Sequence, residues 1–373
     1  MNALWRVLVA LSALVALAGG RPAAQPGLIA LPADVVYDRI HGAWLGQLIG
    51  NFTGLPTEGR YHAIPNPAES VEIVTRDEWQ TDDDTSMEWV ALHILEEYGL
   101  DVTYEEVRQA WIEHINDAIW VANAEARRLM DEGVVPPDTG KRGVNLWWYA
   151  IDAQIESEIF GLIAPGMGKV AQARATWFAR VTNDGYAVDA AAFYAIMYAR
   201  AFVESDPRRI VSEARAYFPP DSEVVRIASD VLAWSEQYPD WRDTRRQIFL
   251  NYDDPPFYTS RPNFAATLMA VLYGGGDFEK TVTIATLAGW DNDCNAATAG
   301  GFVGALLGYS GLPHDLVAGS GDVYRNTNRS GLADDAVSNM AARTQALAEQ
   351  VIRDAGGRIE GEDEERTYFI PTS

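Results

Sequence analysis

The chain has 373 residues, of which 53 are acidic and 29 are basic, so its net charge at neutral pH is −24. A charge of this size repels nucleic acids and anionic membranes, and we expect no partner of either kind. Cys294 is the sole cysteine, which excludes an intrachain disulfide. The five histidines are scattered without a paired spacing, which argues against a zinc site built from histidine.

The first 25 residues have the pattern of a secretory signal peptide. Arg6 is followed by an apolar run over residues 7–18 and then by small residues, with a cleavage box at residues 16–18. The run is short for a transmembrane helix, although an uncleaved anchor is the alternative. We therefore expect a periplasmic or secreted protein whose mature chain contains no membrane span.

Helical patterns dominate the rest of the chain, because apolar residues recur at the spacing of one helix face. In chain order, the predicted helices cover residues 36–51, 85–98, 103–131, 145–160, 186–204, 207–217, 222–237, 241–250, 262–273, 278–288, 295–308 and 337–354. No convincing strand pattern precedes the acidic tail at 356–373, which we expect to be solvated or loosely docked. We predict an all-α fold with a single large compact helical domain over residues 35–355.

Two of these helices carry glycines four residues apart. The first contains Gly42, Gly46 and Gly50, and the second contains Gly300, Gly304 and Gly308. Each glycine costs about 1 kcal/mol relative to alanine inside a helix. A close helix–helix approach in the core is the expected compensation.

Three consecutive aspartates, Asp82, Asp83 and Asp84, precede the helix predicted to begin near Thr85. One aspartate can cap the helix and a second can complement its dipole, each contributing about 1 kcal/mol or less. A third adds mainly repulsion. Capping and a cation site are both open on this segment alone.

A second acidic cluster, Asp291, Asp293 and Asn295, precedes the second glycine-rich helix. Its spacing is similar to the first ligands of an EF-hand, but Ala296 and Phe302 stand where that loop needs Gly and Glu. Capping alone is again the alternative. If the two helix starts meet, the carboxylates raise one another's pKa unless cations relieve the repulsion. Oxygen ligands without histidine or cysteine clusters favour Mg²⁺, Mn²⁺ or Ca²⁺.

From about residue 37 to residue 308, the chain resembles the ADP-ribosylglycohydrolase family, which includes dinitrogenase-reductase-activating glycohydrolase and the ADP-ribosyl-acceptor hydrolases. The resemblance rests on four segments: DRIHGAWLGQLIGNFTGLPTEG, TDDDTSMEW, IDAQIESEIFGLIAPG and GGGDFEKTVTIATLAGWDNDCNAATAGGFVGALLG. It implies an all-α fold with two adjacent divalent cations, Mg²⁺ or Mn²⁺.

The resemblance also assigns residues. It implies the metal ligands Asp82, Asp83, Asp84, Asp291 and Asp293, with an alternative frame that begins at Thr81. Cys294 stands where the family usually has Thr or Ser, and Asn295 could substitute for that ligand. Glu58 matches the loop carboxylate that some members need for catalysis, with a solvated loop acid as the alternative.

Two further segments resemble substrate-binding parts of the family. In VTNDG, Asn183 occupies the position of the family's histidine and Asp184 follows it; in APGMGK, Gly166 belongs to a loop that could bind a diphosphate or form an ordinary turn. The implied activity is hydrolysis of an N- or O-glycosidic bond of an ADP-ribosyl group on a small molecule or a protein. A hydrolase of a different N-glycoside, and a catalytically silent binding member, are the alternatives.

Overall fold

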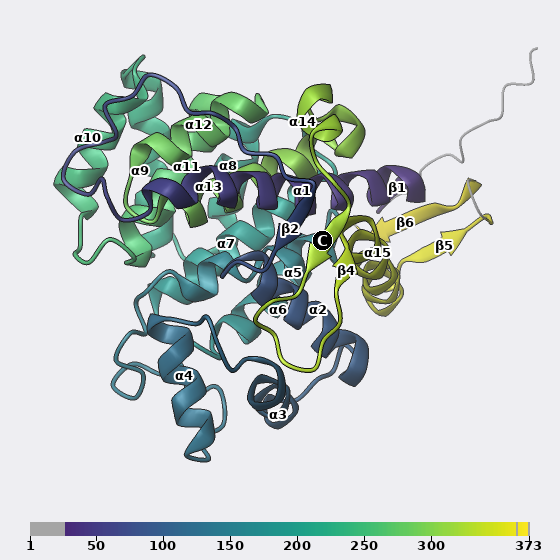
Figure 1. Ribbon diagram of the computed structural model, residues 1–373. Coiled ribbons are helices and arrows are strands. Elements are labelled where there is room, and N and C mark those ends of the chain that lie inside the picture. The colour runs from purple at the N-terminus through teal and green to yellow at the C-terminus, as the bar shows by residue number, and fades with distance from the viewer. Residues whose placement is uncertain (1–26, 363–364, 372–373) are drawn as a thin grey trace, which may run out of the picture.

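The computed structural model describes residues 27–362 and 365–371, so the predicted signal peptide lies outside the described residues. Helices form most of this part of the chain (Figure 1). The α-helices are α1 (Ala33–Gly54), α2 (Thr85–Tyr98), α3 (Tyr104–His114), α4 (Val121–Asp131), α5 (Glu158–Leu162), α6 (Gly168–Ala179), α7 (Tyr186–Ala201), α8 (Pro207–Ala214), α9 (Glu223–Gln237), α10 (Trp241–Tyr252), α11 (Ser260–Gly274), α12 (Phe278–Ala288), α13 (Asn292–Leu307), α14 (His314–Ala318) and α15 (Val337–Asp354).

Short 3₁₀ turns and two small sheets complete the fold. The turns are η1 (Leu55–Thr57), η2 (Asp152–Ile155), η3 (Arg215–Tyr217) and η4 (Tyr309–Gly311). The strands are β1 (Leu28–Pro32), β2 (Glu78–Gln80), β3 (Val323–Arg325), β4 (Asp335–Ala336), β5 (Arg358–Glu360) and β6 (Thr367–Pro371). None of the helices in the described residues is long and apolar enough to span a membrane.

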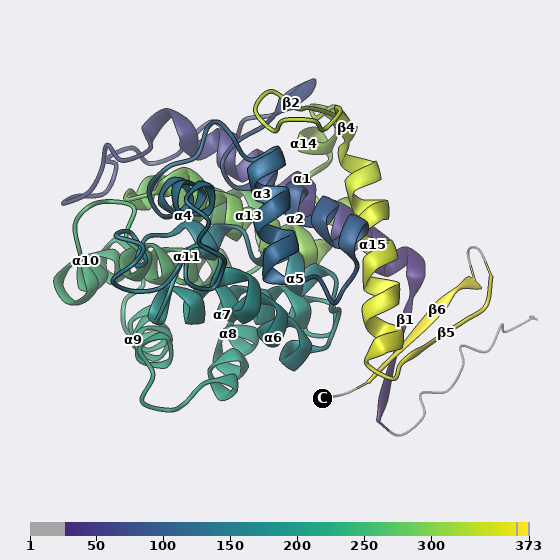
Figure 2. The same ribbon diagram turned by 90° about the horizontal axis from the view of Figure 1, so that it is seen from below.

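The two glycine-rich helices, α1 and α13, lie side by side near the centre of the molecule (Figures 1 and 2). A Cβ atom added to Gly46 would clash with the backbone of Gly300, and one added to Gly50 would clash with Ala296. The pairing runs antiparallel, since later residues of α1 meet earlier residues of α13. The predicted close approach is therefore confirmed, and it brings the C-terminal end of α1 to the N-terminal end of α13.

Part of the C-terminal tail, which we expected to be solvated or loosely docked, forms a strand. Strand β6 pairs antiparallel with β1 on one side and with β5 on the other, at the edge of the molecule beside α15 (Figure 2). Tyr368, Phe369 and Ile370 are buried there. A solvated tail is thus wrong for residues 367–371, because their apolar side chains and backbone hydrogen bonds are both satisfied by docking.

Two of the predicted helices are interrupted. The range 103–131 divides into α3 and α4, and Ala118 between them has a φ of +48°, outside helical backbone. The range 145–160 is mostly turns, followed by η2 and the start of α5. Side chains account for the second break, since the Asn183 amide binds the carbonyl oxygens of Trp148 and Ala150, which a helix would use internally.

Candidate metal centre

Carboxylates from distant parts of the chain line one cavity of about 480 Å³. Glu58 follows η1, Asp83 precedes α2, Asp152 begins η2 and Asp291 precedes α13. Aromatic and apolar side chains form the rest of the wall, among them Trp120, Phe257 and Tyr258. The cavity therefore combines an acidic floor with a wall suited to a flat organic group.

The packing of α1 against α13 sets the position of the second acidic segment. A Cβ atom on Gly54 would clash with the Cα atom of Asp293, so the helix ends are in direct contact. The Asn292 side chain donates to the carbonyl oxygen of Gly54 (3.0 Å) and to the Thr57 hydroxyl (2.9 Å). These contacts fix η1, and with it the loop that carries Glu58, next to Asp293.

The backbone of Trp290, the residue directly before Asp291, is strained. Its φ of +59° is uncommon for a residue with a side chain and costs of order 1–3 kcal/mol. Its backbone N–H donates to the Tyr61 carbonyl (2.8 Å), its indole N–H donates to Asp253 (3.0 Å), and the Arg245 guanidinium lies 3.9 Å from the ring centroid. These contacts hold the turn that directs Asp291 into the cavity.

The three aspartates of the first acidic segment have different surroundings. Asp82 accepts a hydrogen bond from the backbone N–H of Thr85 (2.5 Å), so capping accounts for part of its role. Asp84 is fully buried and accepts from the Asn51 side chain on α1 (2.5 Å). Asp83 lines the cavity and has no capping partner to explain it. Capping alone therefore does not account for the three aspartates.

The two acidic segments lie next to each other in the structure. One possible ligand atom from each of Glu58, Asp291 and Asp293 lies within 4.8 Å of the others, and the same holds for Asp83, Asp293 and Cys294. Asp293 belongs to both groups. Within the two acidic segments, four carboxylate oxygens are buried without a hydrogen-bond partner, namely Oδ2 of Asp82 and Oδ1 of Asp84, Asp291 and Asp293. Such atoms are costly unless a cation or a proton satisfies them.

The electrostatics of the cluster reflect this crowding. Burial, followed by repulsion from Asp83, raises the pKa of Asp291 to about 8 and that of Asp82 to about 7. The same two causes, with further acidic neighbours, raise the pKa of Asp84 well above its ordinary value. For Glu58, partial burial and then Asp83 raise the pKa. Burial keeps the Cys294 thiol protonated by raising its pKa, which suits it poorly to a hard cation.

Sequence reasoning missed further buried acids around the cavity, one of which, Asp152, lines it. Asp152, Glu156 and Glu158 are buried, and so is Glu88 on α2. The Asp152 carboxylate accepts from the backbone N–H of Asn123 (2.8 Å), and Glu158 accepts from the Thr298 hydroxyl on α13 (2.6 Å). The signal for Asp152, Glu156 and Glu158 was present in IDAQIESEIF, where these three acids interrupt an apolar segment.

Arg329 was also missed. It is buried and donates to the Ser86 hydroxyl (2.7 and 3.0 Å) and to the carbonyl oxygens of Asp117 and Ala118. Its positive charge acts to lower the pKa of Asp83, against the larger effect of burial. No local pattern could have identified it, because Ser86 lies 243 positions away in the sequence.

Asn295 and Asn183 have other partners in the structure. The Asn295 side chain accepts from the Thr267 hydroxyl (3.0 Å) and donates to Asn263 (2.7 Å), so its role as a ligand stays a prediction. The Asn183 oxygen accepts from Ala153 N–H and the Thr182 hydroxyl, and its amide group donates twice to the backbone. These four bonds leave Asn183 no free group for a ribose hydroxyl.

Gly166 and Asp184 do not line the acidic cavity. Gly166 is buried against Val203 and Ile370 of β6, and its N–H donates to the Ala199 carbonyl (2.8 Å), so it offers no N–H to a diphosphate there. Asp184 lines a separate cavity of about 900 Å³ and accepts from the backbone N–H of Arg142 (2.9 Å). The two cavities share no lining residue.

Comparisons with known proteins bear on the fold and the family. The family model for ADP-ribosylglycohydrolase matches residues 32–349. No curated protein matches the chain. A solved structure described as an ADP-ribosylglycohydrolase-related protein complex has the same fold, with a TM-score of 0.58 and 18% sequence identity over 84% of this chain and 98% of that one. Because the family model covers most of the chain, including every residue of the acidic cluster, the protein belongs to the ADP-ribosylglycohydrolase family.

Proposed function

We propose that the protein is an exported hydrolase that uses two divalent cations, Mg²⁺ or Mn²⁺, to cleave an N- or O-glycosidic bond of an ADP-ribosyl group. The observation that carries the proposal is the convergence of Asp83, Asp291 and Asp293 with unpartnered, buried carboxylate oxygens. The predicted signal peptide supports export, and a mature N-terminus between residues 19 and 26, found by mass spectrometry, would test it.

The donor set fits hard divalent cations. Asp83 and Asp293 would hold one ion, and Asp291 with Asp293 would hold the other, with Asp82 and Asp84 supplying further oxygens. When bound, such ions would supply positive charge that orients ribose hydroxyls and lowers the pKa of an attacking water. The helix N-termini of α2 and α13 help to tolerate the negative charge of these carboxylates.

Glu58 is the best candidate for the general base. It is exposed at the cavity, within 4.8 Å of Asp291 and Asp293, and therefore can reach both solvent and the cluster. Its raised pKa brings its proton affinity closer to neutral pH, where a general base works efficiently. Glu58 would accept the proton of the attacking water while the sugar passes through a state with oxocarbenium character.

Hydrolysis of a different N-glycoside is the second candidate, favoured by one specific observation. Asn183 and Gly166, which the resemblance linked to ADP-ribose, are both committed to internal contacts. The aromatic wall of Phe257 and Tyr258, whose ring centroids lie 5.2 Å apart, could pack against other flat leaving groups as well as against adenine.

A substrate panel tests the proposal. Wild-type protein with Mg²⁺ or Mn²⁺ should hydrolyse ADP-ribosyl-arginine or ADP-ribosyl-serine peptides, and Asp291→Asn should not. Turnover of simple nucleosides with no action on any ADP-ribosyl compound would support the second candidate instead. Ligand binding without hydrolysis of either class would indicate a catalytically silent member.

A further inference from the structure

A second cluster of possible metal ligands lies where α2 contacts α3, away from the acidic cavity. It consists of His93 and Glu97 on α2 and of His114, the last residue of α3. One possible ligand atom from each residue lies within 4.8 Å of the other two. None of the three lines the acidic cavity, so the cluster is separate from the proposed active site.

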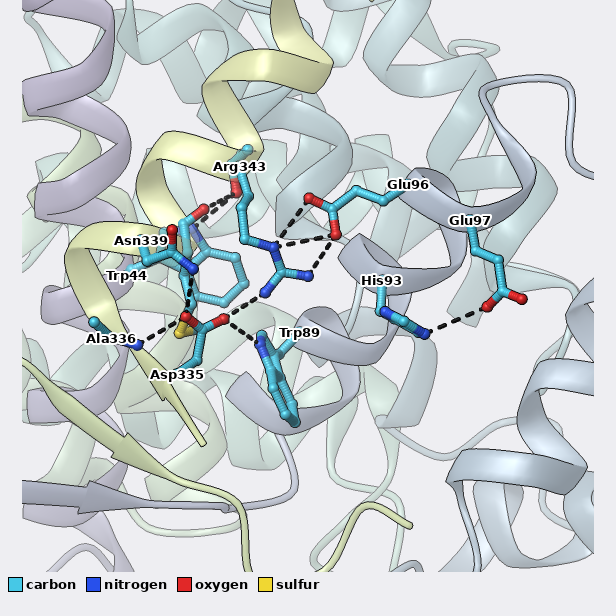
Figure 3. A network of polar contacts seen from close by, with 11 residues as sticks. Trp44, Trp89, His93, Glu96, Glu97, Asp335, Ala336, Asn339 and Arg343 are labelled. Atoms are coloured by element: carbon cyan, nitrogen blue, oxygen red, sulfur yellow. Dashed lines mark hydrogen bonds and ion pairs between the residues drawn. The ribbon is translucent and has the colours of Figure 1, made fainter. Parts of the chain in front are cut away.

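His93 and Glu97 are one helical turn apart and point toward each other (Figure 3). Their Nε2 and Oε2 atoms are 3.4 Å apart. In a tetrahedral site with bonds of about 2.0–2.1 Å, neighbouring ligand atoms are separated by about 3.4 Å. The observed separation therefore suits two ligands of one four-coordinate ion.

His114 is buried and its ring is already oriented. Its Nδ1 lies 2.8 Å from the Ser330 carbonyl oxygen, which can only accept a hydrogen bond, so Nδ1 carries the proton and Nε2 keeps a free lone pair. The centroids of the His93 and His114 rings are 5.0 Å apart and the rings are nearly perpendicular, at 88°. A backbone carbonyl that fixes the tautomer in this way is the usual outer contact of a metal-binding histidine.

The surrounding charges permit a cation. Arg343 is near, but it is paired with both Glu96 and Asp335 (Figure 3), so its charge is balanced. His114 ends α3, where the helix dipole favours positive charge. Burial, and then His114, lower the pKa of His93, which leaves it neutral and able to act as a ligand.

We propose that His93, Glu97 and His114 bind one transition-metal ion of the Zn²⁺ class, with water in the remaining position. Two imidazole nitrogens and one carboxylate oxygen are a donor set for Zn²⁺ and its neighbours in the first transition row, and not for Mg²⁺. The ion would join α2 to α3. Through Ser330 it would also hold the adjacent Arg329, which binds Ser86 at the start of α2.

The test uses tag-free protein that has been stripped of metal and then supplied with excess Mg²⁺ to fill the acidic cavity. Calorimetry with Zn²⁺ and visible absorption with Co²⁺ are recorded for wild type, His93→Gln and Glu97→Gln. The matched control is His314→Gln, because His314 is exposed on α14. Circular dichroism verifies the fold, and Glu97→Gln, at an exposed position, is the variant most certain to keep it.

Wild type and His314→Gln should each bind one Zn²⁺, and Co²⁺ should give the strong visible bands of tetrahedral coordination. Losing an outer contact of a metal-bound histidine typically weakens affinity 10–100-fold, so losing a ligand should weaken it by about 100-fold or more. The Co²⁺ bands should disappear in His93→Gln and Glu97→Gln. Equal Zn²⁺ affinity in all four proteins, or no binding by wild type, would overturn the proposal.

Discussion

Helix α2 has a different kind of polar cluster near each end. Before its first turn, Asp82, Asp83 and Asp84 meet the acidic start of α13, and the possible ligands there are almost all carboxylate oxygens. Toward its last turn, His93 and Glu97 meet His114, and nitrogen donors predominate. One helix therefore presents two sets of donor atoms, each suited to its own class of cation.

The two clusters also differ in what they cost the protein without metal. The carboxylates at the starts of α2 and α13 are crowded together, and burial and mutual repulsion raise their pKa values. A cation bound there would relieve this electrostatic repulsion. The second cluster contains one exposed carboxylate beside two imidazole rings, so no two like-charged acids are forced together there. A metal ion at the first cluster should therefore matter for both stability and activity, whereas an ion at the second should matter mainly for stability.

The largest expected effect comes from Asp83→Asn. Removing this carboxylate should abolish binding of the ion that Asp83 shares with Asp293 and reduce hydrolysis by about 10³-fold or more, since such ions supply several kcal/mol to the transition state. The metal-free variant should nevertheless melt at a higher temperature than metal-free wild type, because one like charge has gone. Calorimetry and thermal melts with and without Mg²⁺ would measure both effects. Asp315→Asn, at an exposed acid on α14, is the control. A variant that melts lower without metal and keeps its activity would contradict this account.

Glu58→Gln should have the next largest effect. The shape of the side chain is kept and proton acceptance is lost, which typically lowers the rate by about 10²–10⁴-fold. Stabilisation by Mg²⁺ should persist, because Asp83, Asp291 and Asp293 remain. Initial rates and melting curves separate the two properties, with Glu69→Gln at an exposed loop position as control. An unchanged rate would remove Glu58 from the mechanism.

Stability should depend on pH in a direction set by the buried acids. Burial raises the pKa of Asp152 and Glu158 to about 7 and that of Asp291 to about 8. Ordinary carboxyl groups have pKa values of about 4. Between about pH 4 and pH 8, the folded metal-free protein therefore holds more protons than the unfolded chain. Its free energy of unfolding should therefore fall as the pH rises through this range.

Saturating Mg²⁺ provides the comparison for the pH experiment, because other groups titrate in the same range. The difference in melting temperature between loaded and metal-free protein should widen from pH 5 to pH 8. A difference that stays constant over this range would show that the buried carboxylates do not titrate together with metal binding.

A smaller effect is expected from Asn295→Ala. The substitution leaves Asn263 and the Thr267 hydroxyl each without one partner and should lower the free energy of unfolding by about 1–3 kcal/mol. The affinity for Mg²⁺ should change little, because the Asn295 oxygen already accepts a hydrogen bond. Chemical denaturation and calorimetry measure the two quantities. A loss of affinity as large as that of Asp83→Asn would restore Asn295 as a ligand.

The sequence could predict the helical fold and the acidic part of the site because their signals are local. The glycines of α1 and α13 and the aspartates before α2 and α13 stand in short, readable patterns. The outcome was different for the segment around residues 145–160, where Asn183 captures backbone carbonyls from 33 and 35 positions away. The periodicity of apolar residues contains no information about a distant side chain that competes with a helix for these carbonyl oxygens.

The missed residues have the same origin. Arg329 donates a hydrogen bond to Ser86, which is distant in the sequence. Strand β6 pairs with β1, which lies at the opposite end of the described chain. The histidines of the second cluster stand 21 positions apart on two helices, so their spacing resembles no known metal motif. Only the antiparallel or crossing arrangement of neighbouring helices places such residues together, and sequence spacing does not contain that information.

The most direct test of the central claim is the number of hard cations held by the acidic cavity. Mn²⁺ binding, counted by dialysis and by electron paramagnetic resonance, should be measured in a His93→Gln background so that the second cluster contributes little. Two Mn²⁺ ions per chain with a magnetically coupled signal are predicted, and Asp293→Asn should lose both, since Asp293 belongs to both ligand groups. Equal Mn²⁺ binding with and without the Asp293 carboxylate would contradict a binuclear centre at this cavity.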